Sequence, residues 1–356
     1  MKLTRVIAFM AMMAAGALLT ITFGATRSVT TILGTGVAGY SDVQVNNPYG
    51  IIFGPDGALY FCDLDNQRIR RFDPKTRAVT TIAGSGEKGY KGDGGPATQA
   101  ALNMPHEIQF DRAGNLYIAE RDNHVIRKVE AKSRIISTVA GTGLAGFDGD
   151  GGPGVKAHLR QPHSIALDRD GTLLICDIGN QRIRRLHLET GIIETYAGTG
   201  EAAETPDGAP VIGTPLRGPR TMAIAPDGDL YLALREGNAI LRIDRRTQTL
   251  HRIAGTGQQG YAGDGGPAVN AKLGGPKGLA YRPGELFVAD TENHVIRRID
   301  LTSRVITTVL GTGVRGDGPE TSPLVCKLSR PHGVLADASG TLYVADSEAH
   351  RIRQLQ

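Results

Sequence analysis

The sequence predicts an all-β fold in which six copies of one unit form a closed ring. A proline opens each unit and recurs at steps of 57 residues four times and then 55, at Pro48, Pro105, Pro162, Pro219, Pro276 and Pro331. Short apolar segments alternate with Gly-containing turn signals, and no segment has apolar residues spaced at 3.6 over a useful length. Repeats of this length, each with four short strands, are typical of a six-bladed β-propeller.

The second repeat shows how one blade is expected to form. Its apolar alternation predicts four antiparallel strands, separated by turn residues, over 107–110, 116–119, 125–129 and 135–140. Residues 111–115 contain glycine and should make the hairpin between the first two strands. The other repeats follow the same order, so the ring should contain almost no helix.

The two ends of the chain predict how the ring closes. The last repeat stops after its third strand, at Gln356. The segment 28–36 reads S-V-T-T-I-L-G-T-G and matches A-V-T-T-I-A-G-S-G, which is the fourth strand of the first repeat and the turn after it. The N-terminal strand should therefore complete the last blade and remove the open edges of the ring.

The first residues do not belong to the ring. Lys2 and Arg5 precede an uncharged apolar run over 6–23, which is the pattern of a secretory signal peptide. We expect residues 1–24 to be this signal and residues 25–356 to be an exported propeller, periplasmic or extracellular. The alternative is an uncleaved anchor, because about 18 apolar residues is the lower limit for a membrane span. Membrane contact is expected only through this segment.

Composition agrees with a loop-rich exported domain and argues against nucleic-acid binding. The chain has 48 glycines and 18 prolines, which punctuate turns. It has 40 Lys and Arg against 36 Asp and Glu; without Lys2 and Arg5 the balance is 38 against 36, or +2. This charge gives no general electrostatic case for a nucleic-acid partner. We expect the ring to be a monomer.

The three cysteines do not indicate a disulfide framework. Cys62 and Cys176 occupy the same position in repeats one and three, where the other repeats have alanine. Equivalent positions two blades apart are too far apart to be bridged, so both should be small buried residues. Cys326, in the last interblade loop, is expected to be an unpaired surface residue.

Several short strings resemble a known repeat family. They are N-H-V-I-R at 123–127 and 293–297, N-Q-R-I-R at 66–70 and 180–184, G-D-G-G-P and D-x-x-G-x-L-Y. Together they resemble NHL repeats, and the resemblance covers about residues 28–356. It implies a six-bladed propeller. It does not name an activity, because NHL propellers include RNA binders, adhesion modules, sensor domains and a few enzymes.

Residues that recur in most repeats are expected to be structural. One set is an arginine of the third strand: Arg70, Arg127, Arg184, Arg242, Arg297 and Arg353. A second set is an acid that ends the second strand: Asp63, Glu120, Asp177, Asp290 and Asp346. Turn chemistry explains the aspartates of G-D-G-G-P better than calcium binding does, because each offers one carboxylate among glycines; they are Asp93, Asp150 and Asp264. His124, His294 and His350 belong to the repeat signature and should also be structural.

The fourth repeat departs from this pattern. Leu234 takes the place of the acid, and the alignment of L-R-E-G-N with the other repeats suggests one extra residue, Arg235. The loss of an acid and the gain of a cation predict a local change in the sign of the charge.

The residue after each opening proline is the candidate ligand contact. All of these side chains can form hydrogen bonds, and pairing between the first two strands should place them near the central channel; in blade order they are Tyr49, His106, His163, Arg220, Lys277 and His332. With Arg235, the sector of blades four and five predicts a cationic arc suited to a carboxylate, phosphate or sulfate. The favoured function is therefore a non-catalytic module that binds an anionic small molecule or a protein segment.

The alternative function is enzymatic. The P-H-x strings at His106, His163 and His332 resemble motifs with which the peptidylglycine amidating lyase family, also a six-bladed propeller, holds zinc in its channel. The resemblance implies that these three histidines would bind zinc or another divalent metal and leave one coordination position open. A lyase or hydrolase would follow, in which Arg220 or Arg235 positions a substrate carboxylate and Tyr49 acts as acid or base. That family places its histidines on alternate blades, whereas here they lie on blades two, three and six.

Overall fold

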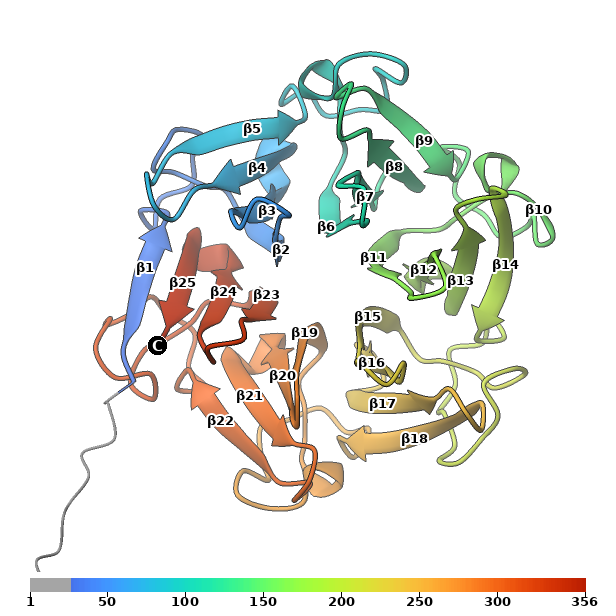
Figure 1. The fold of residues 1–356 in the computed structure, drawn as a ribbon. Helices are drawn as coiled ribbons and strands as arrows, with labels where there is room; N and C mark the ends of the chain where they lie inside the picture. Colours follow the sequence, from blue (N-terminus) through green and yellow to red (C-terminus); the bar gives the residue numbers. More distant parts are fainter. Residues whose placement is uncertain (1–26) are drawn as a thin grey trace, which may run out of the picture.

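The computed structural model describes residues 27–356, which form six blades arranged around a central axis (Figure 1). Every blade contains four antiparallel strands, and the first strand of each lies nearest the axis. The first blade comprises β2 (Pro48–Phe53), β3 (Leu59–Asp63), β4 (Arg68–Phe72) and β5 (Val79–Ala83). The second comprises β6 (Pro105–Phe110), β7 (Leu116–Glu120), β8 (Val125–Val129) and β9 (Ile136–Ala140). The third comprises β11 (Pro162–Leu167), β12 (Thr172–Asp177), β13 (Arg182–His187) and β14 (Ile192–Ala197), with the two-residue β10 (Gly152–Pro153) at its outer edge.

The remaining blades repeat this order. The fourth comprises β15 (Pro219–Ile224), β16 (Leu230–Leu234), β17 (Ala239–Asp244) and β18 (Thr249–Ala254). The fifth comprises β19 (Pro276–Arg282), β20 (Glu285–Asp290), β21 (Val295–Asp300) and β22 (Ile306–Leu310). The sixth comprises β23 (Pro331–Ala336), β24 (Leu342–Asp346), β25 (Arg351–Leu355) and β1 (Val29–Leu33). Within residues 27–356 the helical elements are short 3₁₀ turns: η1 (Leu64–Asn66), η2 (Ala97–Gln99), η3 (Gly154–Lys156), η4 (Ile178–Asn180), η5 (Ala268–Asn270), η6 (Thr291–Asn293) and η7 (Ser347–Ala349).

The predicted propeller, its six blades and its near lack of helix are confirmed. In the second blade the predicted third strand has the observed bounds, and the others differ by one or two residues at one end. The first strand begins at Pro105 because Pro105 already pairs with Glu120 at the end of the second strand.

The N-terminal strand closes the ring as predicted. β1 pairs antiparallel with β25, and Ser28 and Gln356 exchange backbone hydrogen bonds of 3.0 and 3.1 Å. Figure 1 shows β1 at the outer edge of the sixth blade. This pairing satisfies the backbone N–H and C=O groups that would otherwise be exposed at the edges of the two terminal strands.

The core lies between neighbouring blades. Each cluster of buried apolar side chains joins two adjacent sheets; one contains Cys62 and Ile69 of the first blade with Ile108 and Ile118 of the second. Cys62 and Cys176 are fully buried, as predicted. The prediction of a surface position for Cys326 is wrong, because its loop turns inward and the thiol packs beside Leu328 and Leu342 between blades five and six.

The predicted signal peptide or anchor, residues 1–24, lies outside the described residues. Over residues 27–356 no helix has the length and apolar character needed to cross a membrane.

Candidate functional site

The side chains that follow the opening prolines meet at one level of the central channel. Each opening proline pairs with the last residue of the second strand, so that the next residue turns toward the axis. The Tyr49 ring stacks on His332 with centroids 3.9 Å apart and meets the edge of His106 at 4.8 Å. His106 meets His163 edge-on at 4.7 Å. We call these six residues the channel ring: Tyr49, His106, His163, Arg220, Lys277 and His332.

The three histidines of the channel ring are neutral and share one tautomer. In each, Nδ1 lies 2.8 to 2.9 Å from the backbone carbonyl two residues earlier. A carbonyl only accepts, so Nδ1 carries the proton and Nε2 remains an acceptor. Burial, together with the charges of neighbouring cations, holds the pKa of His106, His163 and His332 well below 6.5.

These histidines do not converge on one point. His106 and His163 are neighbours, but the Tyr49 ring of the intervening first blade lies between His106 and His332. Across residues 27–356, no three His, Cys, Asp or Glu side chains are grouped closely enough to hold a metal ion. The predicted zinc ligands therefore do not form a metal site in this structure, because blades two and six flank a blade that contributes tyrosine.

Arg220 is the unusual member of the channel ring. Its side chain comes from β15 and is 3% exposed, yet its Nε and Nη1 atoms have no hydrogen-bond partner among the described residues. Burial lowers the pKa of Arg220 to about 10, against the opposing influence of Tyr49 and Glu107. A buried guanidinium without partners is costly, since each unsatisfied polar group loses its hydration without replacement.

Glu107 is a channel residue that the sequence reasoning missed. It lies one residue deeper on β6 than His106, and it lines a cavity of about 280 Å³ together with Ser164, Thr221 and His332. Burial raises the pKa of Glu107 to about 7, while the charge of Arg220 opposes this rise. The internal repeat contained a signal for it, because the other five repeats have only Gly, Ser or Thr at this position.

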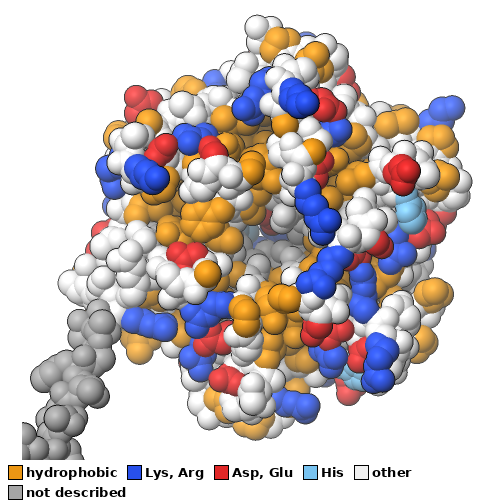
Figure 2. All heavy atoms as spheres, viewed as in Figure 1, with side chains coloured by type: hydrophobic (Ala, Val, Ile, Leu, Met, Phe, Trp, Pro, Cys, Tyr) orange, Lys and Arg blue, Asp and Glu red, His pale blue; other side chains and the backbone are white. Residues whose placement is uncertain are grey.

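The cavity opens at the face that carries the hairpins between first and second strands. Its outer wall is apolar and includes Ile52, Ile224, Tyr281 and Leu335. Figure 2 shows the hollow at the centre of the ring with hydrophobic side chains around it. Glu107 and His332 line the cavity, and Arg220 does not.

The cationic arc predicted from Arg220, Arg235 and Lys277 is reduced to Arg220. Lys277 Nζ lies 2.6 Å from Glu292, and burial lowers the pKa of Lys277 to about 8. Glu292 also pairs with Arg330 at 2.7 Å. Arg235 is paired with its neighbour Glu236 and is partly exposed.

The predicted insertion in the fourth blade is wrong. Leu234 pairs with Ala239 just as Glu120 pairs with Val125, so the two loops have equal length. Arg235 therefore occupies the place of Arg121. Leu241 stands at the position of the repeated arginine, and Arg242 is the residue after it. Asn238 has the left-handed backbone of His124 and therefore corresponds to His124, not to Asn123.

The repeated acids and arginines hold each blade to the loop before it. Glu120 accepts the backbone N–H of Asn103 at 3.0 Å and the Asn123 amide at 2.6 Å, and it faces Arg127 at 3.4 Å. Arg127 also pairs with Asp93 at 2.7 Å. We call such a set of acid, asparagine and arginine the blade clamp. The aspartates of G-D-G-G-P pair with the clamp arginines and do not merely shape a turn.

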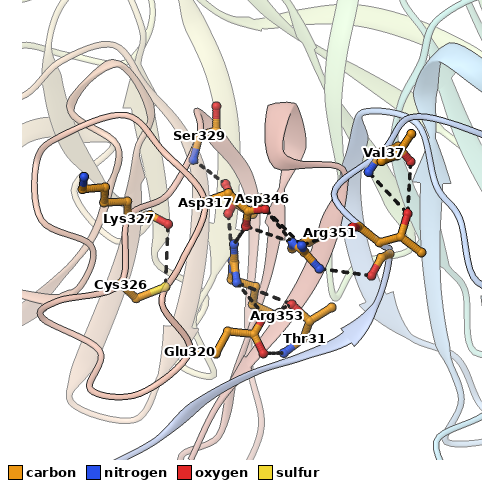
Figure 3. Close-up of polar contacts among 12 residues, drawn as sticks. Thr31, Val37, Asp317, Glu320, Cys326, Lys327, Ser329, Asp346, Arg351 and Arg353 are labelled. Atoms are coloured by element: carbon orange, nitrogen blue, oxygen red, sulfur yellow. Dashed lines mark hydrogen bonds and ion pairs between the residues drawn. The ribbon is translucent and has the colours of Figure 1, made fainter.

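The last blade shows the same contacts with strands from both ends of the chain. Arg353 donates to Asp346 at 2.8 Å and pairs with Glu320 at 3.0 Å and with Asp317 (Figure 3). Glu320 also accepts the backbone N–H of Thr31 on β1 at 3.0 Å. The ion pairs therefore help to join the N-terminal strand to the sixth blade.

The repeat histidines connect successive blades. Nδ1 of His124, His294 and His350 accepts the backbone N–H of the residue before the next opening proline, at 3.1 to 3.2 Å. Their predicted structural role agrees with these contacts.

These features define a six-bladed propeller whose repeats are held by buried polar clamps and whose channel contains one buried, unpartnered arginine. The family model described as NHL repeat matches residues 159–186 and 328–355. Both matches cover strands one to three of a blade and the residues just before it, so the third and sixth blades resemble NHL repeats in sequence.

Curated relatives resemble most of this chain but extend well beyond it. Protein SUPPRESSOR OF QUENCHING 1, chloroplastic, of Arabidopsis thaliana is 27% identical over 310 residues, which are 83% of this chain and 29% of that protein. Human NHL repeat-containing protein 2 is 26% identical over 286 residues, 72% of this chain and 39% of its own length. The chain thus spans less than half the length of these relatives.

Solved structures share the fold at low sequence identity. An auxiliary nutrient binding protein from Bacteroides thetaiotaomicron superposes with a TM-score of 0.66 at 16% identity, covering 93% of this chain and 76% of the other. A virginiamycin B lyase from Staphylococcus aureus has a TM-score of 0.56 at 15% identity, covering 93% and 98%. At these identities the likeness concerns the fold alone.

Proposed function

We propose that this propeller is a binding module that holds an anionic group, a carboxylate, phosphate or sulfate, in its central channel. The observation that carries the proposal is the Arg220 guanidinium, buried with two N–H positions unpartnered. An oxyanion would supply the missing acceptors and the missing charge in one step, and the planar fork of arginine suits such a group.

The neighbours of Arg220 support an anion with further hydrogen-bond donors. His106 and His163 present unprotonated Nε2 atoms, which accept and do not donate. Ser164 and Thr221 supply hydroxyls in the cavity below. A ligand with an acidic group for Arg220 and hydroxyls or amides for the imidazoles fits this chemistry. A small molecule or a protein segment carries the acidic group in this proposal, and either would enter through the apolar mouth.

Binding of this kind includes a small rearrangement. The cavity is lined by Glu107 and His332 but not by Arg220, so ring side chains move aside when an anion contacts Arg220. The proposal places the protein outside the cytoplasm, in the periplasm or beyond it, on the basis of the charged and apolar segments at residues 2–23. Neither nucleic acid nor the membrane surface is a partner of the ring in this proposal.

The test is a ligand screen on matched variants. Wild-type protein, Arg220→Met and Arg235→Met are titrated calorimetrically with phosphate, sulfate, citrate and short hydroxy acids at low and physiological salt. We expect at least one anion to bind the wild type and the Arg235→Met control, and binding to fall by tenfold or more in Arg220→Met, because charge-assisted hydrogen bonds contribute about 1.5–3 kcal/mol. Equal binding by the wild type and Arg220→Met would contradict the proposal.

A metal-dependent lyase or hydrolase is the alternative function, and the separation of the three histidines among the described residues counts against it. It can be separated by elemental analysis of protein purified without chelator, with His106→Ala as the comparison. One metal per chain, lost in that variant, would replace the binding proposal with an enzymatic one.

A further inference from the structure

The fourth blade lacks its blade clamp, because the acid, the asparagine and the arginine are replaced together. Only the aspartate of the preceding loop is kept, as Asp207, which accepts the backbone N–H of Arg252 at 2.7 Å. Leu234 stands for the acid, Gly237 for the asparagine and Leu241 for the arginine. In the second blade the corresponding side chains are Glu120, Asn123 and Arg127. At these three positions the fourth blade is therefore apolar or has glycine. Four other blades are polar at all three positions, and the sixth keeps its acid and arginine.

The cover over this position is also replaced. In blades one, two and five a tyrosine of the preceding loop lies near the arginine and contacts a threonine of the fourth strand; for Tyr90 and Thr138 the hydroxyls are 2.7 Å apart. In blade four the two positions are Glu204 and Arg252, and they form an ion pair of 2.8 Å. The tyrosine ring that covers the arginine in blades one, two and five is thus absent from blade four, and the Glu204–Arg252 ion pair lies in its place.

One carbonyl that the arginine normally satisfies has a new partner. Arg127 donates to the carbonyl of Ala101 at 3.1 Å, and the equivalent carbonyl in the fourth blade is that of Pro215. Thr205 donates its hydroxyl to Pro215 at 2.8 Å. The loop is therefore held without the arginine, and the space of the arginine is left open.

The result is a cavity of about 260 Å³ on the face of the interblade loops, separate from the channel. Its floor is Leu234, Ala239 and Leu241, and its rim includes Glu204, Arg217, Arg252 and Gln258. Glu204 and Arg252 neutralise each other. Arg217 is exposed and has no acidic partner among the described residues, so the rim offers one free positive charge over an apolar floor.

We propose that this cavity, the blade-four pocket, binds a small organic acid with an apolar body. The apolar body rests on Leu234 and Leu241, and the carboxylate faces Arg217. Charge complementarity selects an acid over an amine, because the only uncompensated charge on the rim is a guanidinium. The size of the cavity suits a phenyl ring or a short alkyl chain with its linker.

The experiment uses 3-phenylpropionate as the probe and 3-phenylpropan-1-amine as its matched control. Binding to the wild type is measured by ligand-observed NMR titration. The decisive variant is Leu234→Asp/Leu241→Arg, which refills the cavity with the ion pair used in the other blades. We expect the acid to bind the wild type and the amine to bind at least tenfold more weakly. The refilled variant should lose binding, and Arg217→Met should weaken it about tenfold.

Two further variants keep the test decisive. Gln258→Trp covers the cavity from an exposed rim position and should also abolish binding, even if the refilled variant does not fold. Arg220→Met alters the channel and should leave binding unchanged, so that failure of the channel proposal is distinguishable from failure of this one. Equal binding of acid and amine, or equal binding by wild type and both cavity-filling variants, would overturn the proposal.

Discussion

The fourth blade and the other five solve the same packing problem with opposite chemistry. In the fifth blade Asp290 and Arg297 are both fully buried, 3.5 Å apart, whereas in the fourth blade two leucines occupy these positions. Burial raises the pKa of Asp290 to about 6 even with the arginine beside it, so the desolvation of the carboxylate outweighs the pairing. Apolar replacement of both members is often neutral, but loss of one leaves a buried charge alone. The comparison teaches that a blade keeps or loses the buried acid and the buried arginine together.

The largest expected effect is the loss of one clamp member. Arg297→Leu leaves Asp290 buried without its cation and should lower the free energy of unfolding by about 3–5 kcal/mol. The triple variant Asp290→Leu/Asn293→Gly/Arg297→Leu, which copies the fourth blade, should recover more than half of this loss. Urea denaturation followed by circular dichroism measures both. If the triple variant is no more stable than the single one, the leucines of blade four are not equivalent to a clamp.

A second comparison sets the paired arginines against Arg220. Arg297 donates to two backbone carbonyls and pairs with Asp264, whereas Arg220 has unpartnered N–H groups among the described residues. Arg220→Met should therefore raise the stability of the ligand-free protein, by about 1–3 kcal/mol, because it removes an unsatisfied buried charge. Thermal denaturation without added anions measures the change. A marked fall in melting temperature would mean that Arg220 is structural. Lys277→Met, which breaks the ion pair with Glu292, is the control that shows how large the fall is when a structural channel cation is lost.

The reverse exchange in the fourth blade should change stability least. Leu234→Asp/Leu241→Arg restores the acid and the arginine, while Gly237 still lacks the asparagine amide. We expect a free energy of unfolding within roughly 2 kcal/mol of the wild type, since gained ion pairing and lost apolar burial nearly cancel. Each single substitution should be clearly more destabilising than the double one. Additive single effects in urea denaturation would mean that the two positions are not coupled.

The internal repeat made the fold predictable. It also predicted which residues line the channel, but not how they are paired. The opening prolines and the strand alternation gave the blades, and the match of segment 28–36 to the first repeat gave the closure, because both depend on local sequence. The channel ring followed from strand pairing. The charge pairing and burial of the ring residues could not be predicted in this way. The pairing of Lys277 with Glu292 depends on a loop fifteen residues away, and the burial of Arg220 depends on all six blades.

The errors have a common physical source. Arg242 and Arg235 were misplaced because an asparagine was aligned by identity, while the structure aligns the residue with left-handed backbone, Asn238 with His124. Cys326 was placed at the surface because its loop has no repeat partner with the same length. Glu107 stands out only at the next channel level, where the other five repeats have Gly, Ser or Thr.

The smallest expected effect concerns pH and the two charges of the channel. Glu107 has a pKa raised by burial to about 7, so in the folded protein it is mostly neutral at pH 6 and mostly ionised at pH 8. Its negative charge would repel an anion at Arg220 by roughly 1 kcal/mol, about fivefold in affinity. Anion affinity should therefore fall as pH rises from 6 to 8, and Glu107→Gln should remove this dependence.

The same group predicts the pH dependence of stability, with a sign that can be checked. Because the folded pKa of Glu107 lies above its ordinary value of 4.5, the folded state binds more protons between these two values. Its stabilising contribution is complete below about pH 4.5 and is lost as pH rises through about 7. The difference in free energy of unfolding between wild type and Glu107→Gln should shift in favour of the variant over this window. A difference that stays constant from pH 4.5 to 8 would mean that Glu107 is ionised throughout and already paired with Arg220, and the channel would then have no uncompensated charge to offer an anion.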